Sequence, residues 1–249
     1  MTRVPTSRLD RLLANMAYAS RREIQLLAKN GRIRLDGAPF LAADARIALT
    51  PDLETRLVVD GEALDPLPGF ALMLNKPLGV TCSRKEAGPL VYDLLPARWR
   101  RRDPAISTVG RLDKETSGLL LMTDDGALLH RIISPKRHVA KRYRVGLARP
   151  MTGNEAELFA SGTLMLEGED KPLAPAGLTV VGPQEAVLEV HEGRYHQVRR
   201  MFAAVGNHVE TLHRQSIGGL CLPADLAPGA IRRLGEADLA AIFDAESGD

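Results

Sequence analysis

The segment Asp65-Pro66-Leu67-Pro68-Gly69 constrains the fold more than any other part of the sequence. Two prolines and a glycine within five residues interrupt helices and strands alike, so this segment is the best candidate for a linker. It divides the chain into residues 1–66 and residues 67–249. A total of 249 residues is enough for two domains of unequal size that each bury a core. We therefore predict one domain on each side of the linker.

The part before the linker predicts a pair of helices followed by two strands. Apolar side chains recur at positions i, i+3, i+4 and i+7 within residues 8–18, which is typical of an amphipathic helix. Ser20 and Glu23 have the spacing of a capping box and predict the start of a second helix. Two alternating runs, each followed by an Asp-Gly pair (Asp36-Gly37 and Asp60-Gly61), predict strands that end in tight turns.

The part after the linker predicts more strands than helices. Apolar or alternating runs predict strands at 72–75, 119–123, 143–148 and 186–191. Helical spacing and one further capping box predict helices at 153–161, 195–205 and 236–244. Because the strands come in runs rather than in regular βα repeats, we predict an α+β fold with a mixed, largely antiparallel sheet.

The net charge of +2 hides an uneven distribution. Residues 1–35 hold eight Lys or Arg against two acids, and residues 98–149 hold thirteen against five. The segments 36–66 and 150–190 are acidic, with seven acids each against two and one basic residues. Two basic blocks suit a polyanionic partner such as nucleic acid. Solvated surface charge explains the same pattern, so charge alone leaves both interpretations open.

Composition argues against several classes of protein. The longest unbroken apolar runs have five residues, whereas about 20 are needed to cross a bilayer. The N-terminus carries the acid Asp10 and no apolar stretch, so we expect no secretory signal. Cys82 and Cys221 form no Cys-x-x-Cys motif, which argues against a zinc ribbon and a disulfide framework and favours the reducing cytoplasm. The histidine pairs lie five positions apart and favour no metal site.

A glycine and a lone carboxylate, Gly110 and Asp113, lie in a polar loop just before the predicted strand 119–123. An aspartate in such a loop is either a turn residue or a reactive carboxylate, and spacing alone favours the turn. The sequence contains no Walker loop, no GxGxxG motif and no arrangement of serine, histidine and aspartate that would indicate a hydrolase triad.

Four blocks resemble, in order, the motifs of the pseudouridine synthase family: Leu74–Gly79, Gly110–Leu120, Lys141–Tyr143 and Glu192–Phe202. The part before the linker resembles the S4 RNA-binding module, over about residues 7–65. Together they resemble the S4-fused branch that modifies ribosomal RNA, and the segment from Glu192 to Gly219 is most like its small-subunit members. None of these motifs accounts for the basic cluster Arg98–Arg102.

The resemblance implies that uridine is isomerised to pseudouridine in small-subunit ribosomal RNA, at uridine 516, without a cofactor. A base inside a duplex has to be flipped out before such chemistry. Asp113 matches the catalytic aspartate, Tyr143 the tyrosine that stacks on uracil, and Arg199 the arginine expected to pair with Asp113. Whether Asp113 adds to the base or ribose, or removes a ribose proton, stays open.

The resemblance also implies RNA contacts in both parts of the chain. The S4-like residues expected to contact phosphates are Arg8, Arg21, Arg22, Lys29, Arg32 and Arg34. The residues expected to bind substrate or RNA in the second part are Lys76, Arg111, Lys141, Arg194 and Arg200. Lys76 and Lys141 are expected either to support the site or to contact a phosphate. The expected partner is ribosomal RNA or a small-subunit assembly particle, bound by a cytoplasmic monomer.

Three alternatives remain at this stage. The first is a synthase that acts on large-subunit RNA. The second is a non-catalytic S4-type ribosome-assembly protein, which would have lost at least one of Asp113, Tyr143 and Arg199, whereas all three are present. The third is a hydrolase that uses Asp113 with a histidine partner, which requires the two side chains to meet in the fold.

Overall fold

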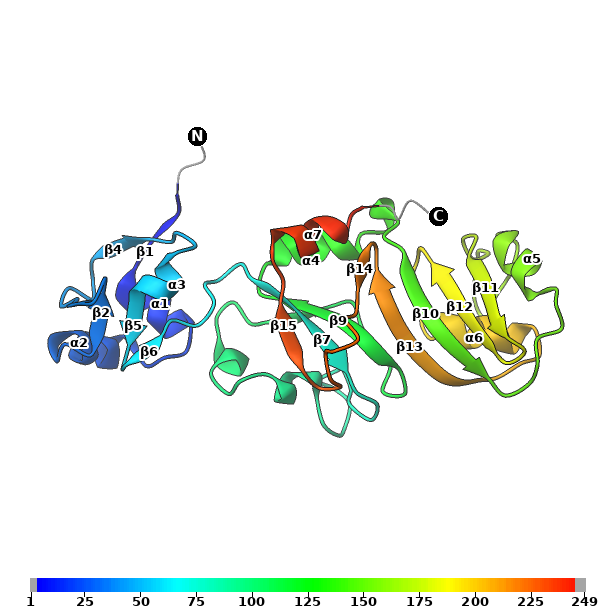
Figure 1. Ribbon diagram of the computed structural model, residues 1–249, viewed down its shortest axis with the longest axis horizontal. Coiled ribbons are helices and arrows are strands. Elements are labelled where there is room, and N and C mark those ends of the chain that lie inside the picture. Colours follow the sequence, from blue (N-terminus) through cyan, green and yellow to red (C-terminus); the bar gives the residue numbers. More distant parts are fainter. Residues whose placement is uncertain (1–3, 245–249) are drawn as a thin grey trace. The chain divides into compact units, whose positions relative to one another are not determined.

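The computed structural model describes residues 4–244, apart from the side chain at position 135, and these form two compact units (Figure 1). The first unit comprises the described residues up to Phe70 together with Leu95–Ser107 and Thr123–Asp125. The second comprises Ala71–Leu94, Thr108–Met122 and the described residues from Gly126 onward. Two short segments beyond the linker thus belong to the first unit, which the linker position does not predict. The boundary at 66/67 itself stays a prediction.

The first unit combines two small sheets with short helices. Its helices are α1 (Leu9–Asn15), α2 (Arg21–Lys29) and α3 (Leu53–Arg56), with a 3-10 turn at Trp99–Arg101. Its strands are β1 (Thr6–Arg8), β2 (Ile33–Leu35), β3 (Ala38–Pro39), β4 (Arg46–Ala48), β5 (Leu57–Val59) and β6 (Glu62–Ala63). β1 pairs with β4, and the other four form a sheet in the order β3-β2-β5-β6.

Local sequence signals explain where helix α2 starts and where the strands of this unit turn. The Glu23 amide donates to the Ser20 hydroxyl at 3.3 Å, and the Ser20 amide donates to the Glu23 carboxylate at 2.8 Å, so the predicted capping box is confirmed. Asp36 and Asp60 have positive φ angles of 53° and 61°, as tight Asp-Gly hairpin turns require. The predicted helix pair and its two strands are therefore present, and α1 is shorter than the 8–18 prediction.

The basic cluster Arg98–Arg102 has structural partners in the same unit. The Arg98 guanidinium donates to the Asp65 carboxylate at 2.6 Å and lies 4.1 Å from the centre of the Tyr18 ring. Arg102 is buried and forms an ion pair with Asp124 at 3.6 Å. These contacts explain why segments distant in sequence belong to the first unit, and they give the cluster a role in packing.

The second unit is built on a mixed sheet whose strands follow the order β11-β12-β10-β13-β9-β7-β15 (Figure 1). β14 pairs with β13, and β8 pairs with β9. These are β7 (Ala71–Lys76), β8 (Ser107–Val109), β9 (Ser117–Thr123), β10 (Lys141–Leu147), β11 (Gly177–Gly182), β12 (Glu185–Val190), β13 (Val209–Ile217), β14 (Leu220–Cys221) and β15 (Ile231–Arg233). β9 and β13 are parallel, whereas β10 is antiparallel to both of its neighbours. The predicted α+β fold with a mixed sheet is confirmed.

The helices of this unit are α4 (Gly126–Ile133), α5 (Glu155–Ala160), α6 (Gln197–Ala204) and α7 (Glu236–Ala241), with 3-10 turns at Val91–Leu94 and Pro135–Arg137. The Glu155 carboxylate accepts from the Thr152 amide at 2.7 Å, but the N-cap is Asn154, so α5 begins later than predicted. No helix within residues 4–244 is long and apolar enough to cross a membrane.

Two apolar clusters form the core of the second unit. In the first, Phe159 of α5 and Phe202 of α6 meet edge to face at 5.3 Å and pack with β10, β12 and β13. In the second, strands β7 and β9 pack with α4 through residues such as Leu119, Leu121 and Ile132. These two clusters set the positions of the strands and of α6, which carry the site described next.

Candidate active site

Three of the four family-like blocks, those that contain Asp113, Tyr143 and Arg199, meet around one cavity of about 430 Å³ in the second unit. Members of both apolar clusters line it, including Val198 and Ile217. The predicted site residues in its lining are Arg111, Asp113, Lys141, Tyr143, Arg194 and Arg199. Arg214 also lines the cavity, although it is not among the predicted site residues. Side chains from segments more than 100 positions apart therefore share one site.

Asp113 lies on a loop whose main-chain carbonyls accept hydrogen bonds from two cationic side chains, Lys76 and Arg199. The Thr116 amide donates to the Asp113 carbonyl at 3.0 Å, which closes a turn directly after the aspartate. Lys76 is completely buried, and its ammonium donates to the carbonyls of Thr116 at 2.8 Å and Pro77 at 3.0 Å. Burial lowers the pKa of Lys76 below its ordinary value. Because it is enclosed, Lys76 cannot contact an RNA phosphate and instead supports the loop.

Arg199 is the second cation on this loop, and its predicted ion pair with Asp113 is wrong. Its guanidinium donates to the Glu115 carbonyl at 2.7 Å and to the Val209 carbonyl at 2.8 Å. No carboxylate among residues 4–244 forms an ion pair with Arg199. The guanidinium therefore ties the loop to the start of β13 through main-chain oxygens and not through the Asp113 carboxylate.

A histidine lies next to Asp113, in the place expected for Arg199. The Nε2 of His196 lies 3.4 Å from Oδ1 of Asp113, and both side chains are 38% exposed. His196 precedes α6 in a left-handed conformation with φ of 48°. Its ring stacks on that of Tyr195 with centroids 3.9 Å apart. The histidine partner required by the hydrolase alternative is thus present, so the geometry at Asp113 does not by itself exclude that class.

Arg214 is a buried cation of the cavity that sequence reasoning missed. Its Nε donates to the Leu119 carbonyl at 2.7 Å, and its Nη1 donates to the Tyr143 hydroxyl at 3.3 Å. Its Nη2 is buried without a hydrogen-bond partner in the part of the chain that the structure describes. Alternation along β13 buries Arg214 together with Leu212 and Ser216. An arginine on the buried face of a strand is the signal that could have identified it.

Gly118 explains how the aspartate loop comes so close to Arg214. It pairs with Arg214 where β9 and β13 run parallel, and its φ is +104°. A Cβ at this position would overlap the Arg214 backbone. Only glycine fits both the backbone conformation and this close approach. Gly118 is therefore required by the packing of β9 against β13, the strand that carries Arg214 at the cavity.

The cavity is cationic, with Tyr143 half-buried on its wall. Lys141 is two residues before Tyr143 on the same strand, so both side chains lie on one face of β10. Burial, and to a lesser degree the charge of Arg214, lowers the pKa of Lys141 to about 8. Arg111 is exposed at the cavity and has no ion-pair or hydrogen-bond partner within residues 4–244. The arrangement suits an anionic ligand that carries a flat ring.

Lys141→Met is expected to raise the free energy of unfolding at pH 7 by about 1–3 kcal/mol, because the wild type buries a charged ammonium there. From about pH 8 up to the ordinary value of 10.5, the unfolded chain binds a proton that the folded protein does not. Wild-type stability therefore rises with pH across this window, and the advantage of the variant disappears above it. Urea unfolding at pH 7 and pH 9.5 measures the change.

The control for this experiment is Lys136→Met, which removes an exposed lysine from the same unit. It should change stability little and equally at both pH values. An advantage of Lys141→Met that is the same at pH 7 and pH 9.5 would contradict the burial of charge at Lys141.

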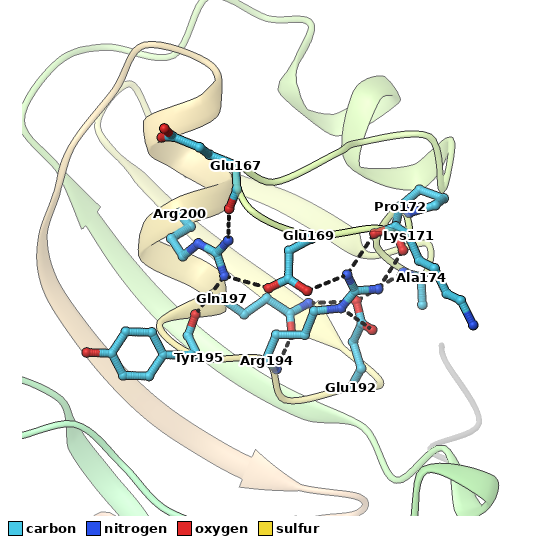
Figure 2. A network of polar contacts seen from close by, with 10 residues as sticks. All are labelled: Glu167, Glu169, Lys171, Pro172, Ala174, Glu192, Arg194, Tyr195, Gln197 and Arg200. Atoms are coloured by element: carbon cyan, nitrogen blue, oxygen red, sulfur yellow. Dashed lines mark hydrogen bonds and ion pairs between the residues drawn. The ribbon is translucent and has the colours of Figure 1, made fainter.

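Arg194 and Arg200, both expected to contact RNA, have partners within the protein (Figure 2). The two guanidinium groups share the Glu169 carboxylate, at 3.3 Å from Arg194 and 2.8 Å from Arg200. Arg194 also pairs with Glu192 at 3.2 Å, and Arg200 donates to the Glu167 carbonyl at 2.6 Å. These contacts form a network that joins the loop around Glu169 to the start of α6, and the RNA contacts of both arginines stay a prediction.

In the first unit, the six residues expected to contact phosphates fall into two groups. Arg8 and Arg21 both pair with the buried Asp10, at 2.9 and 3.0 Å, and Arg32 pairs with Asp60. The hydrogen bond from Arg8, more than that from Arg21, lowers the pKa of Asp10 to about 2. The remaining residues, Arg22, Lys29 and Arg34, are exposed, and none of their side chains has an ion-pair or hydrogen-bond partner among the described residues.

Residues 4–244 contain no cluster of three or more His, Cys, Asp or Glu side chains that could hold a metal ion. Comparison with known proteins discriminates between the remaining classes. A model of the RNA pseudouridylate synthase family matches residues 71–204, which include Asp113, Tyr143 and Arg199. The match favours a synthase over a hydrolase at this site.

Relatives match nearly the whole chain. The chain is 42% identical over 239 residues to the ribosomal small subunit pseudouridine synthase A of Escherichia coli, and the match covers 94% of this chain and 99% of that protein. It is 39% identical to an uncharacterised RNA pseudouridine synthase of Bacillus subtilis, over 93% of this chain and 96% of that protein. A crystal structure of a pseudouridylate synthase superposes with a TM-score of 0.66 at 34% identity, over 94% of this chain and 99% of that chain.

Proposed function

The chain belongs to the RNA pseudouridylate synthase family, and we propose that it isomerises a uridine to pseudouridine in small-subunit ribosomal RNA. The observation that carries the proposal is the 42% identity, over 94% of the chain, to a relative named for that subunit. By resemblance, the target is uridine 516. A large-subunit target is the alternative.

The geometry supports a role for Asp113 at the reacting atoms. Isomerisation breaks the bond between the ribose C1′ and N1 of uracil and forms a bond between C1′ and C5. The C5 hydrogen leaves and N1 gains a proton, so no oxidant or other co-reactant is needed. A carboxylate that faces the cavity, on a loop fixed by Lys76 and Arg199, can act as nucleophile or base. Tyr143 would stack on the flipped uracil, and Arg214 would hold the Tyr143 hydroxyl.

We assign the first unit to phosphate binding, in line with its resemblance to the S4 module. Arg22 and Lys29 are seven positions apart on α2 and so lie on one face of the helix, with the exposed Leu26 between them. Arg34 is exposed on β2. Phosphate contacts position a protein on RNA without reading its sequence. The choice of target uridine then belongs to the second unit, in a cytoplasmic monomer.

Arg22→Gln, Lys29→Gln and Arg34→Gln together are expected to flatten the salt dependence of RNA binding. Each lost phosphate contact reduces the slope of log K against log salt by roughly 0.7 to 0.9, so three lost contacts reduce it by about 2 to 3. Binding of ribosomal RNA by the full-length protein across a series of KCl concentrations measures the slope.

The matched control is Arg56→Gln, which removes one exposed charge of the same unit that already pairs with Asp36 and Asp52. Its slope should stay close to that of the wild type. A slope unchanged in the triple variant would contradict the assignment of these three side chains to RNA.

The decisive test of the proposed function is a modification map. The protein is incubated with small-subunit RNA, large-subunit RNA and small-subunit assembly particles, all from cells that lack the enzyme, and pseudouridine is mapped in each. We expect one new pseudouridine in small-subunit RNA, at uridine 516. A product in large-subunit RNA only, or no product in any substrate, would overturn the proposal. The comparison of free RNA with particles identifies the physiological substrate.

A further inference from the structure

We propose that Tyr195 is a stacking platform for the base of a nucleotide next to the target uridine. This inference rests on the proposed function, because it takes the ligand of the cavity to be RNA. Tyr195 lines the cavity and is 70% exposed, whereas large apolar and aromatic side chains usually lose most of their exposure on folding. An exposed aromatic ring at the edge of a site for nucleic acid is typical of base stacking.

The rings of Tyr195 and His196 already form the first two layers of a stack. Their centroids are 3.9 Å apart and their planes differ by 15°. His196 also contacts the aspartate loop, since its ring nitrogen Nε2 lies 3.4 Å from the Asp113 carboxylate. The high exposure of Tyr195 leaves ring surface to which a further flat ring can be added. A base stacked on Tyr195 would therefore lie one layer outward from the pair that borders Asp113.

The depth of the two tyrosines distinguishes their ligands. Tyr143 is half-buried, and its hydroxyl accepts a hydrogen bond from the buried Arg214. It is therefore the tyrosine for a base that has been flipped fully into the cavity. Tyr195 is exposed and has no hydrogen-bond partner for its hydroxyl within residues 4–244. Tyr195 can therefore stack on a base that stays outside the cavity, and such a base belongs to a nucleotide next to the target uridine.

The backbone of Tyr195 is held by the network of Figure 2, whereas its ring points away from that network. Arg200 donates to the Tyr195 carbonyl at 3.2 Å, and the Gln197 side chain accepts from the Arg194 amide at 3.0 Å. Glu169 balances the charge of both arginines. The polar groups thus fix the turn that carries Tyr195 and His196, and they leave the ring free to receive a ligand. Glu169 is, on this view, a positioning residue for Tyr195.

The test is a cycle of protein and RNA changes, carried out in an Asp113→Asn background so that the RNA is bound but not converted. The RNA is a fragment around the uridine identified by the modification map, either intact or with an abasic nucleotide on its 5′ or its 3′ side. Tyr195→Ala should weaken the binding of intact RNA by about 5- to 150-fold. Tyr195→Phe should stay within about twofold of the parent, because stacking needs the ring and not the hydroxyl.

The affinities for the two abasic RNAs distinguish base stacking by Tyr195 from a role of Tyr195 in the fold. On the RNA that lacks the stacked base, the parent and Tyr195→Ala should bind equally, whereas on the other abasic RNA the full loss should remain. Glu169→Gln should weaken the binding of intact RNA and leave unchanged the binding of the RNA that lacks the stacked base. Tyr92→Ala, a tyrosine of the same unit that does not line the cavity, is the matched control and should leave all affinities unchanged.

Two results would overturn the inference. One is equal affinity of the parent and Tyr195→Ala for intact RNA. The other is the same loss on intact RNA and on both abasic RNAs, which would assign Tyr195 to the fold or to the phosphate chain. Failure of the proposed function is read separately, from the absence of pseudouridine with the wild type. If the wild type forms pseudouridine but Tyr195→Ala binds intact RNA as tightly as the parent, the role of Tyr195 is refuted and the proposed function stands.

Discussion

Asp113→Asn is expected to lower the rate of pseudouridine formation at least about a thousandfold and to leave RNA affinity within a few-fold. The amide has the size of the carboxylate but neither attacks carbon nor accepts a ribose proton. The loop should keep its position, because Lys76 and Arg199 hold it through the carbonyls of Thr116 and Glu115. Single-turnover release of the C5 hydrogen from labelled uridine measures the rate, and filter binding measures the affinity.

The matched control is Glu115→Gln, which makes the same chemical change two residues along the same loop. The Glu115 side chain is exposed and does not line the cavity, so turnover should stay near the wild-type value. Turnover by Asp113→Asn that is comparable to the control would remove Asp113 from the reaction.

Arg214→Met is expected to reduce turnover by about 10²–10³-fold and to lower the free energy of unfolding by about 2–4 kcal/mol. The change leaves the Leu119 carbonyl and the Tyr143 hydroxyl without their donor and removes the buried, unpartnered Nη2 from the cavity. Arg214→Lys keeps the charge but cannot donate in the same three directions, so it should recover only part of either loss. Single-turnover rates and urea unfolding measure the two effects.

Arg144→Met serves as the control, because Arg144 is exposed on the neighbouring strand and, among residues 4–244, pairs only with the partly exposed Glu185. Such a surface pair contributes at most about 1 kcal/mol, and the residue lies outside the cavity lining. If Arg214→Met kept full turnover while losing stability, Arg214 would be a packing residue and not part of the site.

Local features of this chain could be predicted from its sequence. The capping box at Ser20 depends on residues three positions apart, and the Asp-Gly turns depend on adjacent ones. The strand after Asp113 follows from an unbroken apolar run, which the structure buries in β9. Each of these predictions depends on interactions within a few residues, where spacing in sequence is also spacing in space.

Contacts between distant segments could not be predicted in the same way. The resemblance places Arg199 near Asp113, but a family motif does not specify which oxygen a guanidinium binds, and the structure gives it two carbonyls. Arg200 looks exposed on a helical projection until the loop that carries Glu169 covers it. The position of Arg98 beside Tyr18 likewise depends on a chain path that no local pattern encodes.

The way in which Lys76 and Arg199 hold the aspartate loop has a consequence for sequence variation. Both cations bind carbonyl oxygens, which every amino acid supplies, and neither binds a side chain of the loop. The side chains of Lys114 and Glu115 project into solvent. A saturation library over this loop should therefore tolerate almost any residue at 114 and 115 that preserves the turn, while position 113 accepts only aspartate. The position of Asp113 thus depends on two cations distant in sequence, Lys76 and Arg199, whereas the identity of residues 114 and 115 can vary.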